Sequence, residues 1–387
     1  MLRVLIAHNA YQQRGGEDSV VESEISLLRA RGHEVIEYRR CNDDLNRMSP
    51  TSVVLQTMWS RRSGAELAEL FATARPNVVH VHNTFPLISP SLYWAADEAR
   101  VPVVQTLHNF RLLCPQAMLL RAGKVCEDCV GKLPWRGVVR GCYRDSVAQS
   151  AVLGGMLSLH RALGSYQKKV SRYIALTEFG RQKFIEGGLP AERISVKPNF
   201  VDPPPMRPPG RREGFLFVGR LSAEKGVNVL ADAMRLEPEL CCEVIGVGPE
   251  QEKLAQLPRV IMSGWQQGDF VLARMQAARA LVMPSVWYEG FPRTIVEAFA
   301  AGLPVIASRL GSMAASIDDG RTGLLFEPGN AADLAEKLRW AETHPDEMAE
   351  MGLAALKEYE ARYTPEKNYE MLMEIYADAI DANHQVA

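Results

Sequence analysis

The sequence predicts an α/β protein with two doubly wound parallel sheets, one in each half of its 387 residues. Short apolar runs of strand length alternate with segments of helical spacing, a proline-rich segment divides the chain near its middle, and the alternation restarts beyond it. A strand that helices cover on both faces of its sheet typically has a continuous apolar sequence of this kind. At roughly 100–200 residues per domain, the length fits this division.

The first half contains five apolar runs that we expect to form one sheet. The run at residues 3–8 ends in a turn, and the following segment has helical spacing at Val21, Ile25 and Leu28 before Gly32 ends it. The predicted elements of this half are strands at 3–8, 35–38, 77–82, 101–106 and 172–176 and helices at 18–31 and 178–186.

The segment 198–212 contains six prolines, so we interpret it as a linker between two domains. Beyond it we predict strands at 214–218, 242–245, 259–262, 280–283 and 304–307 and a helix at 227–234. The expected domains are 1–200, with a cysteine-containing basic insertion at about 111–150, then 201–364, and a C-terminal helix at 365–387 that packs back on the first domain. Ligands of such sheets bind at the carboxyl ends of the strands.

Composition excludes several classes of protein. With 47% hydrophobic and 23% charged residues, the chain is neither disordered nor collagen-like. It has no apolar run of the ~18 residues that span a membrane and no signal-peptide pattern, so we expect a cytoplasmic protein.

The net charge of −2 divides into +8 for residues 1–200 and −10 for residues 201–387. Residues 111–183 carry 13 basic and 4 acidic side chains, which suits an anionic partner or, alternatively, a solvated basic face.

Two motifs in the second half carry charged residues in loops. Glu289 follows a predicted strand in a loop with glycine and proline, and Glu297 lies eight residues later in an apolar helical run. Such carboxylates can face a ligand and bind a diol, although a helix dipole alone also favours an N-terminal glutamate. Arg220 and Lys225 lie in a glycine-bounded loop before a helix, where they can converge on a diphosphate or form a solvated basic turn.

Two further features lie in the first half. The paired glycines Gly15 and Gly16 follow the first strand and precede the first helix, so a phosphate or sugar could approach the backbone closely, or the pair could form a plain turn. His82 and His108 each close a predicted strand, which places both at the same edge of the sheet. The alternative is a structural role for each histidine.

Together with Thr106-Leu-His108 and the run Val196-Lys-Pro-Asn-Phe-Val-Asp202, these motifs resemble the retaining glycosyltransferases of family 4 in order and spacing. The resemblance covers nearly the whole chain. It implies the GT-B fold, in which two Rossmann-like domains face a cleft and a C-terminal helix returns to the first domain.

The resemblance also assigns roles to residues. Arg220 and Lys225 would stabilise the leaving diphosphate, Glu289 and His108 would contact the donor sugar, and these four are the expected catalytic residues. The expected substrate-binding residues are Gly15, Gly16, His82, Asn199, Gly290, Phe291, Pro292, Arg293 and Glu297, of which Glu297 would bind the ribose. Pro292 and Phe200 stand where the family often has glycine, so details of sugar recognition differ here.

The implied activity is transfer of a sugar from a nucleotide-diphosphate sugar, linked to UDP or GDP, to a hydroxyl of a glycan or lipid-linked acceptor. The expected mechanism retains the anomeric configuration by front-face attack and needs no metal or other cofactor, because Arg220, Lys225 and helix N-termini supply the positive charge. The basic segment adds the expectation that the protein binds the inner face of the plasma membrane peripherally.

Four of the seven cysteines lie in the basic segment as Cys114, Cys126, Cys129 and Cys142, with a CxxC at the centre. Four thiolates suit a tetrahedral structural zinc, and unligated thiols are the alternative. Other functions remain open: a GT-B sugar-nucleotide epimerase or phosphorylase, or a zinc-stapled nucleic-acid-binding protein. The last leaves both charged motifs unused and lacks a recognised nucleic-acid-binding pattern, so we expect no nucleic-acid partner.

Overall fold

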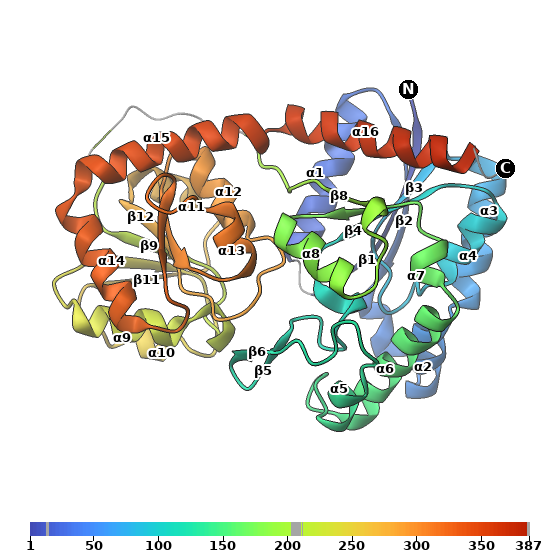
Figure 1. Cartoon of the computed structure of the whole chain (residues 1–387), viewed down its shortest axis with the longest axis horizontal. Helices are drawn as coiled ribbons and strands as arrows, with labels where there is room; N and C mark the ends of the chain where they lie inside the picture. Colours follow the sequence, from blue (N-terminus) through green and yellow to red (C-terminus); the bar gives the residue numbers. More distant parts are fainter. Residues whose placement is uncertain (13–14, 203–209, 211, 385–387) are drawn as a thin grey trace. The chain divides into compact units, whose positions relative to one another are not determined.

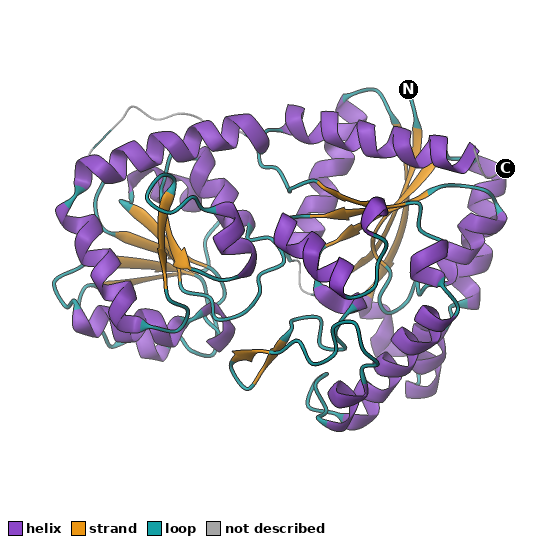
Figure 2. Cartoon of the chain, in the orientation of Figure 1, coloured by secondary structure: helices purple, strands orange, loops and turns teal. Residues whose placement is uncertain are grey.

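The computed structural model describes residues 1–12, 15–202, 210 and 212–384. The chain divides into two compact units. The first comprises Met1–Leu119, Glu127–Pro198 and the chain from Asn368 onward, and the second comprises Leu120–Cys126 and Asn199–Lys367. In each unit, helices cover strands that form a parallel sheet (Figure 2).

The sheet of the first unit has six parallel strands (Figure 1). In spatial order they are β2 (Glu34–Cys41), β1 (Arg3–Ala10), β3 (Val78–Asn83), β4 (Val103–Leu107), β7 (Arg172–Ala175) and β8 (Ile194–Val196). The helices are α1 (Gly16–Ala30), α2 (Pro50–Met58), α3 (Arg61–Ala74), α4 (Ser91–Glu98), α5 (Trp135–Val139), α6 (Val147–Ala162), α7 (Ser165–Lys168), α8 (Glu178–Glu186) and α16 (Pro365–His384). Since every strand runs in the same direction, all of their carboxyl ends meet at one edge.

One face of this sheet is covered by α1 and α16, which lie far apart in the sequence (Figure 1). The shared core contains apolar side chains of four strands and both helices, namely Val4, Ile6, Val21, Ile25, Leu28, Val78, Val104, Ile174, Leu372, Ile375, Tyr376 and Ala379. In α16 the buried positions recur every three or four residues, as expected for one helix face. The C-terminal helix is therefore part of the first unit's core.

A buried ion pair joins the same helices to the end of the sheet. Lys197, which follows β8, places its Nζ 2.5 Å from Oε1 of Glu24 in α1 and 3.1 Å from Oδ1 of Asn368 in α16. The Asn368 side chain also donates to the carbonyl oxygen of Pro198 at 2.7 Å. The Lys197 and Glu24 side chains are 0% and 1% exposed, so each charge depends on the other for compensation.

The second unit repeats the architecture with another six-stranded parallel sheet. In spatial order the strands are β11 (Val260–Gly264), β10 (Cys242–Ile245), β9 (Phe215–Val218), β12 (Ala280–Met283), β13 (Val305–Ser308) and β14 (Gly323–Phe326). The helices are α9 (Val227–Leu236), α10 (Glu252–Ala255), α11 (Gly268–Ala277), α12 (Arg293–Ala300), α13 (Gly311–Ser316), α14 (Ala331–Thr343) and α15 (Pro345–Arg362). Two apolar cores fill the two faces of the sheet.

The fold class predicted from the sequence is confirmed, with differences in detail. Each sheet has a sixth strand, β8 or β14, that the sequence analysis did not assign. β8 is only three residues long with a serine at its centre, and β14 begins with a glycine, so neither is a clear apolar run. Residues 120–126 form a small antiparallel hairpin of β5 (Leu120–Arg121) and β6 (Lys124–Val125), and they group with the second unit rather than the first. Most of the predicted linker, 203–209 and 211, lies outside the described residues.

We expect Lys197→Met to lower the free energy of unfolding of the first unit by ~3–5 kcal/mol, because it leaves the Glu24 carboxylate buried without a compensating charge. Urea unfolding followed by tryptophan fluorescence measures the change. The double variant Glu24→Leu/Lys197→Met should be less destabilised than Lys197→Met alone.

The matched control is Arg29→Met, which breaks an exposed ion pair with Glu37 in the same unit. Exposed pairs contribute roughly 1 kcal/mol or less, so this variant should unfold close to the wild type. Equal urea midpoints for Lys197→Met and Arg29→Met would show that the buried pair does not support the fold as described.

Candidate active site

In the second unit, a glycine brings the loop after β9 against the end of β12. Gly226 has a φ of +73°, and a Cβ at this position would lie 1.8 Å from the carbonyl oxygen of Pro284. Only glycine permits this conformation at this distance. The loop 219–226 is thereby placed beside the β12–α12 loop, which carries Glu289.

This close approach pairs two of the predicted catalytic residues. The Nζ of Lys225 lies 2.8 Å from Oε1 and 3.0 Å from Oε2 of Glu289. Glu289 is buried, and its Oε1 also accepts hydrogen bonds from Ser285 Oγ at 2.7 Å and Trp287 Nε1 at 3.1 Å. The ammonium lies 5.8 Å from the Trp287 ring centre, which adds a cation–π contact. The carboxylate thus holds Lys225 in one place before any ligand binds.

Arg220 lies on the surface of the same loop. Its side chain is 66% exposed and forms an ion pair with Glu224 within the loop. Glu224 also accepts a hydrogen bond from Ser222 Oγ at 2.7 Å, so two contacts fix the carboxylate that orients the guanidinium. An exposed arginine held at a strand's carboxyl end can bind an incoming anion.

The second predicted carboxylate, Glu297, lies one turn into α12 and pairs with Arg293 at its first residue. Their closest atoms, Glu297 Oε1 and Arg293 Nε, are 3.1 Å apart. Burial raises the pKa of Glu297, and Arg293 opposes this shift. Pro292 precedes the helix as its N-cap residue and donates no backbone hydrogen bond there.

The rest of this loop is fixed by contacts within the second unit. Ser312 Oγ donates to the carbonyl oxygen of Gly290 at 3.1 Å. Phe291 packs against the apolar core beside Tyr363, so its side chain supports the loop.

Asn199 lies outside this loop, at the start of the second unit. It is buried, and no hydrogen-bond partner for its Oδ1 is found among the described residues.

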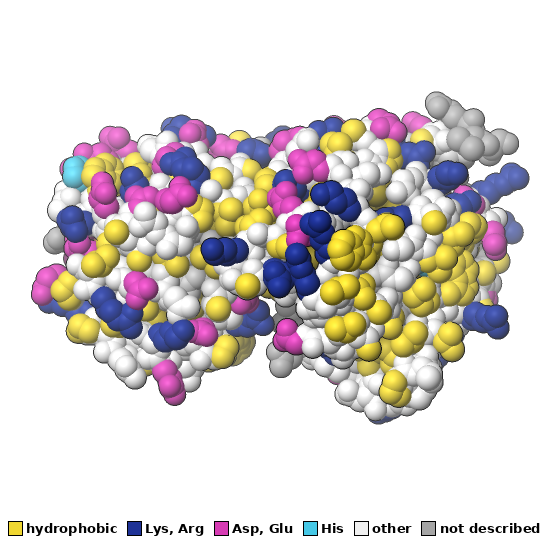
Figure 3. All heavy atoms as spheres, turned by 60° about the horizontal axis from the view of Figure 1, so that its bottom comes forward, with side chains coloured by type: hydrophobic (Ala, Val, Ile, Leu, Met, Phe, Trp, Pro, Cys, Tyr) yellow, Lys and Arg dark blue, Asp and Glu magenta, His cyan; other side chains and the backbone are white. Residues whose placement is uncertain are grey.

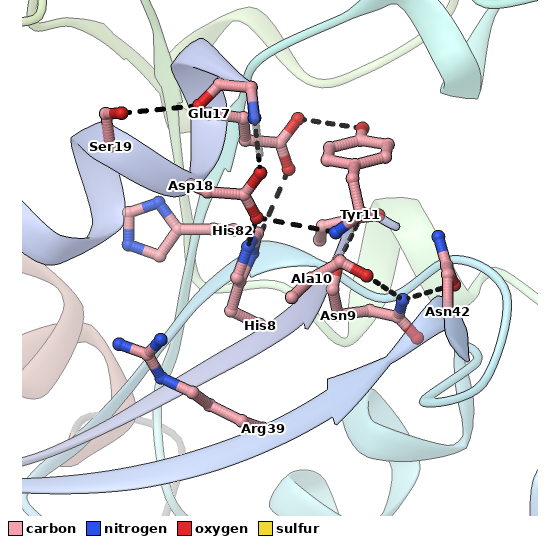
Figure 4. Close-up of polar contacts among 12 residues, drawn as sticks. His8, Asn9, Ala10, Tyr11, Glu17, Asp18, Ser19, Arg39, Asn42 and His82 are labelled. Atoms are coloured by element: carbon pink, nitrogen blue, oxygen red, sulfur yellow. Dashed lines mark hydrogen bonds and ion pairs between the residues drawn. The ribbon is translucent and has the colours of Figure 1, made fainter. Parts of the chain in front are cut away.

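In the first unit, polar side chains gather where β1 ends and α1 begins (Figure 4). His8 Nε2 lies 2.8 Å from Asp18 Oδ1, and Asp18 Oδ2 accepts from the backbone N–H of Gly15 at 2.8 Å. Tyr11 donates its hydroxyl proton to Glu17 Oε2 at 3.0 Å. Gly15 is the N-cap of α1 and Gly16 its first residue, and a Cβ at Gly16 would meet no described atom within 4 Å. Arg14, beside them, lies outside the described residues.

Glu17 is an unusual member of this group. Burial raises its pKa to about 8, although its hydrogen bond with Tyr11 opposes the shift. Its Oε1 has no hydrogen-bond partner among the described residues and lies 4.0 Å from His8 Nδ1, which also has none. The Glu17 carboxyl, at the carboxyl edge of the sheet, is therefore harder to ionise than an ordinary glutamate.

The predicted strand-end histidines form a row with a third histidine. His82 Nδ1 lies 2.9 Å from His108 Nε2, and the two rings stack with centres 5.2 Å apart. His80, two residues before His82 on β3, bonds Tyr376 through Nδ1 and Thr106 through Nε2, both at 2.8 Å. His80 and His82 are fully buried, whereas His108 is partly exposed.

The structure thus brings Lys225 together with Glu289 in the second unit and His82 together with His108 in the first, but it also shows residues that sequence reasoning missed. His8, Tyr11, Glu17 and Asp18 were not proposed, although they flank the Gly15-Gly16 pair on both sides. Their position between a strand end and a helix start was the available signal.

The four cysteines proposed for zinc do not appear as a candidate site. Among the residues that the structure describes, one set of three metal-ligand side chains has its ligand atoms within 4.8 Å of one another, and it consists of Glu24, His80 and His82. Cys114, Cys126, Cys129 and Cys142 form no such set among those residues. Zinc binding by these cysteines stays a prediction.

Chemically, the second unit offers two basic side chains and two carboxylates at one edge, which suits a sugar linked to a diphosphate. Two families of known proteins match the chain, one in each half. The family described as "Glycosyltransferase Family 4" matches residues 14–204, and the family described as "Glycosyl transferases group 1" matches residues 202–358.

Curated relatives match parts of the chain. A D-inositol 3-phosphate glycosyltransferase of Pseudarthrobacter chlorophenolicus is 30% identical over 317 residues, which are 73% of this chain and 66% of the relative. The sulfoquinovosyl transferase SQD2 of Arabidopsis thaliana is 36% identical over 152 residues, or 38% of this chain and 29% of the relative. The chain thus spans less than two thirds of the length of these relatives.

Solved structures match over nearly the whole chain. The Anabaena protein HepE in complex with UDP has a TM-score of 0.70 at 18% identity and covers 97% of this chain and 100% of its own. A sucrose-phosphate synthase from Thermosynechococcus elongatus has a TM-score of 0.72 at 17% identity, with 99% and 100% covered. These likenesses show the GT-B fold. The two family matches overlap at residues 202–204 and together cover residues 14–358, so the chain belongs to the group 1 glycosyl transferases.

Proposed function

We propose that the protein transfers a sugar from a nucleoside-diphosphate sugar to an acceptor hydroxyl and retains the configuration at the anomeric carbon. The observation that carries this proposal is the Lys225–Glu289 pair, with Arg220 on the same loop. A diphosphate leaving group needs positive charge that is in place before the bond breaks. The UDP complex of HepE supports a nucleotide donor, here linked to UDP or GDP.

In the proposed reaction, the bond between the anomeric carbon and the diphosphate oxygen breaks, and its electron pair goes to the diphosphate. Lys225 and Arg220 stabilise the charge that develops there. The acceptor oxygen bonds the anomeric carbon on the same face, and its proton passes to the departing phosphate. Glu289 keeps Lys225 oriented and meets the sugar, Glu297 binds the ribose, and no divalent cation is required.

We propose that the first unit binds the acceptor, a glycan or a lipid-linked glycan intermediate. Support comes from the polar group around His8 and Glu17 at the carboxyl edge of its sheet, beside the open position at Gly16. His108, partly exposed at a neighbouring strand end, would contact the donor sugar.

A mass-spectrometric screen of nucleotide sugars against glycan and glycolipid acceptors tests the reaction class. A glycosylated acceptor and free nucleoside diphosphate support a transferase. A sugar phosphate formed with inorganic phosphate would instead indicate a phosphorylase, and an epimerised sugar an epimerase.

We expect Arg220→Ala and Lys225→Ala each to lower kcat/KM by about 10²–10³-fold, the effect of removing one preorganised charged partner of the transition state. Initial rates and binding of the nucleoside diphosphate measure the losses. Arg235→Ala, which removes an exposed arginine of α9 paired with Asp232, is the matched control and should keep normal rates. Normal activity in both loop variants would sink the assignment.

Activity should survive treatment with EDTA and should need neither added Mg²⁺ nor Mn²⁺, because Arg220 and Lys225 provide the charge that a cation otherwise supplies. Initial rates with and without chelator measure this. A strict requirement for either cation would contradict the proposed mechanism.

Elemental analysis of the untreated protein separately tests zinc binding by the four cysteines. About one zinc per chain supports a structural site, and no zinc rejects it.

We further propose that the first unit binds anionic membranes, where a lipid-linked acceptor resides. Around α5, the side chains of Leu133, Trp135 and Val139 are 64%, 60% and 68% exposed. The arginines Arg136, Arg140 and Arg144 lie in or shortly after the same segment of the chain, and Arg136 and Arg140 both pair with Asp128. Figure 3 shows hydrophobic and basic side chains side by side on this face of the unit. In the described part of the chain, no helix is long and apolar enough to span a bilayer.

We expect co-sedimentation with anionic but not neutral vesicles, and its loss at high salt, because each basic residue contributes ~1 kcal/mol near an anionic surface. The triple change of Arg136, Arg140 and Arg144 to Gln should abolish binding, and Trp135→Ser should weaken it. Trp265→Ser, at a 71% exposed tryptophan of the second unit, is the matched control. Equal failure to bind both vesicle types at low salt would end this proposal.

A further inference from the structure

His82 does not lie where a substrate could reach it. It is only 4% exposed, on the face of β3 that α1 and α16 cover. The partly exposed residue is His108 at the end of β4, and His82 stacks directly behind it. Each histidine places one ring nitrogen, Nδ1 of His82 and Nε2 of His108, 2.9 Å from the other. One of these nitrogens must therefore carry the hydrogen and the other must accept it.

The surroundings of the other ring nitrogen of His82 determine which of these two nitrogens carries the hydrogen. His82 Nε2 lies 3.4 Å from Glu24 Oε2, and neither atom has a hydrogen-bond partner among the described residues. Burial alone would raise the pKa of Glu24, but Lys197 and the neighbouring histidines hold that pKa below its ordinary value. The carboxylate is therefore ionised and can only accept. A bare nitrogen facing it would be repelled, so His82 carries its hydrogen on Nε2.

We propose that Glu24 and His82 are positioning residues that fix the tautomer of His108. With hydrogen on Nε2, His82 has a bare Nδ1, which accepts from the Nε2–H of His108. The Nδ1 of His108 is then bare as well. His108 therefore presents a hydrogen-bond acceptor, so the hydroxyl that it contacts must donate. The consequence for substrate choice rests on the proposed transferase function, whereas the tautomer does not.

A metal ion at Glu24, His80 and His82 is the rival explanation of this group. The ammonium of Lys197, 2.5 Å from Glu24, would repel a cation. Both ring nitrogens of His80 already have partners, Tyr376 and Thr106. The group is therefore better explained as a row of ordered hydrogen bonds.

The His108 ring should also stay neutral over the ordinary pH range. Burial lowers its pKa to about 3, with Glu24 opposing the shift and His8 and Lys197 adding to it. The titratable and charged groups that face the row are His8 of β1, Asp18 and Glu24 of α1, His80 and His82 of β3, Lys197 after β8 and Tyr376 of α16. Burial also lowers the pKa of His80 and His82 well below the ordinary value, so these histidine rings are neutral at neutral pH.

Nitrogen NMR of the full chain with ¹⁵N-labelled histidine tests the proposal without any substrate. Signals of His108 are assigned with His108→Gln. We expect Nε2 protonated and Nδ1 bare, with no change between pH 5 and 8. In His82→Phe, which keeps a ring but has no nitrogen, both tautomers of His108 should be populated.

His82→Gln is the conservative variant that should rescue the tautomer. Its amide can donate to Glu24 and accept from His108, in the same direction as the histidine. His33→Phe, at a histidine bonded to Tyr369 away from the row, is the control and should leave the His108 signals unchanged. Where transferase activity is present, His82→Phe should raise the KM for the donor about tenfold, the effect of one hydrogen bond, and His82→Gln should restore it.

A protonated Nδ1 on His108 in the wild type would overturn the proposal, as would an unchanged tautomer in His82→Phe. If His82→Phe does not fold, the wild-type spectrum and His82→Gln still decide. Because the NMR uses no substrate, an inactive protein with the expected tautomer would refute the proposed function and leave this inference standing.

Discussion

The buried pair of Lys197 and Glu24 is the interaction on which the first unit depends. It joins the residue after the last strand to the first helix, and Asn368 adds the C-terminal helix to the same contact. A buried ammonium and carboxylate are tolerated only together, so the three segments must meet for the fold to be stable. The same pair sets the electrostatics of the histidine row, since Lys197 keeps Glu24 ionised and Glu24 orders His82.

The second unit uses a different constraint for a similar purpose. There the glycine at 226 allows the β9 loop to contact the end of β12, and this contact pairs Lys225 with Glu289. The cost of orienting Lys225 is met when the chain folds rather than when a ligand binds, which is the basis of electrostatic preorganisation. Glu224 orients Arg220 in the same way, but at an exposed position.

Both arrangements follow from parallel sheets, whose strands all end at one edge. Residues distant in the sequence, such as His8, His82 and His108, reach the same edge because β1, β3 and β4 run together. Helices that start at this edge add backbone donors, as α1 does beside Asp18 and Gly15. In each unit, the parallel sheet therefore places the candidate site residues at one edge.

The sequence by itself determined the two-sheet fold class, the family and the charged motifs, because apolar runs and glycine-bounded loops are local signals. It also located the helix Glu178–Glu186 and the strands Cys242–Ile245 and Ala280–Met283. Only the tertiary structure decided the partners. Lys197 and Glu24 are 173 residues apart and Lys225 and Glu289 are 64 apart, and no periodic pattern relates them. Likewise, burial of His82 behind His108 depends on how α1 and α16 cover β3, since a strand's alternation does not reveal which face a helix will cover.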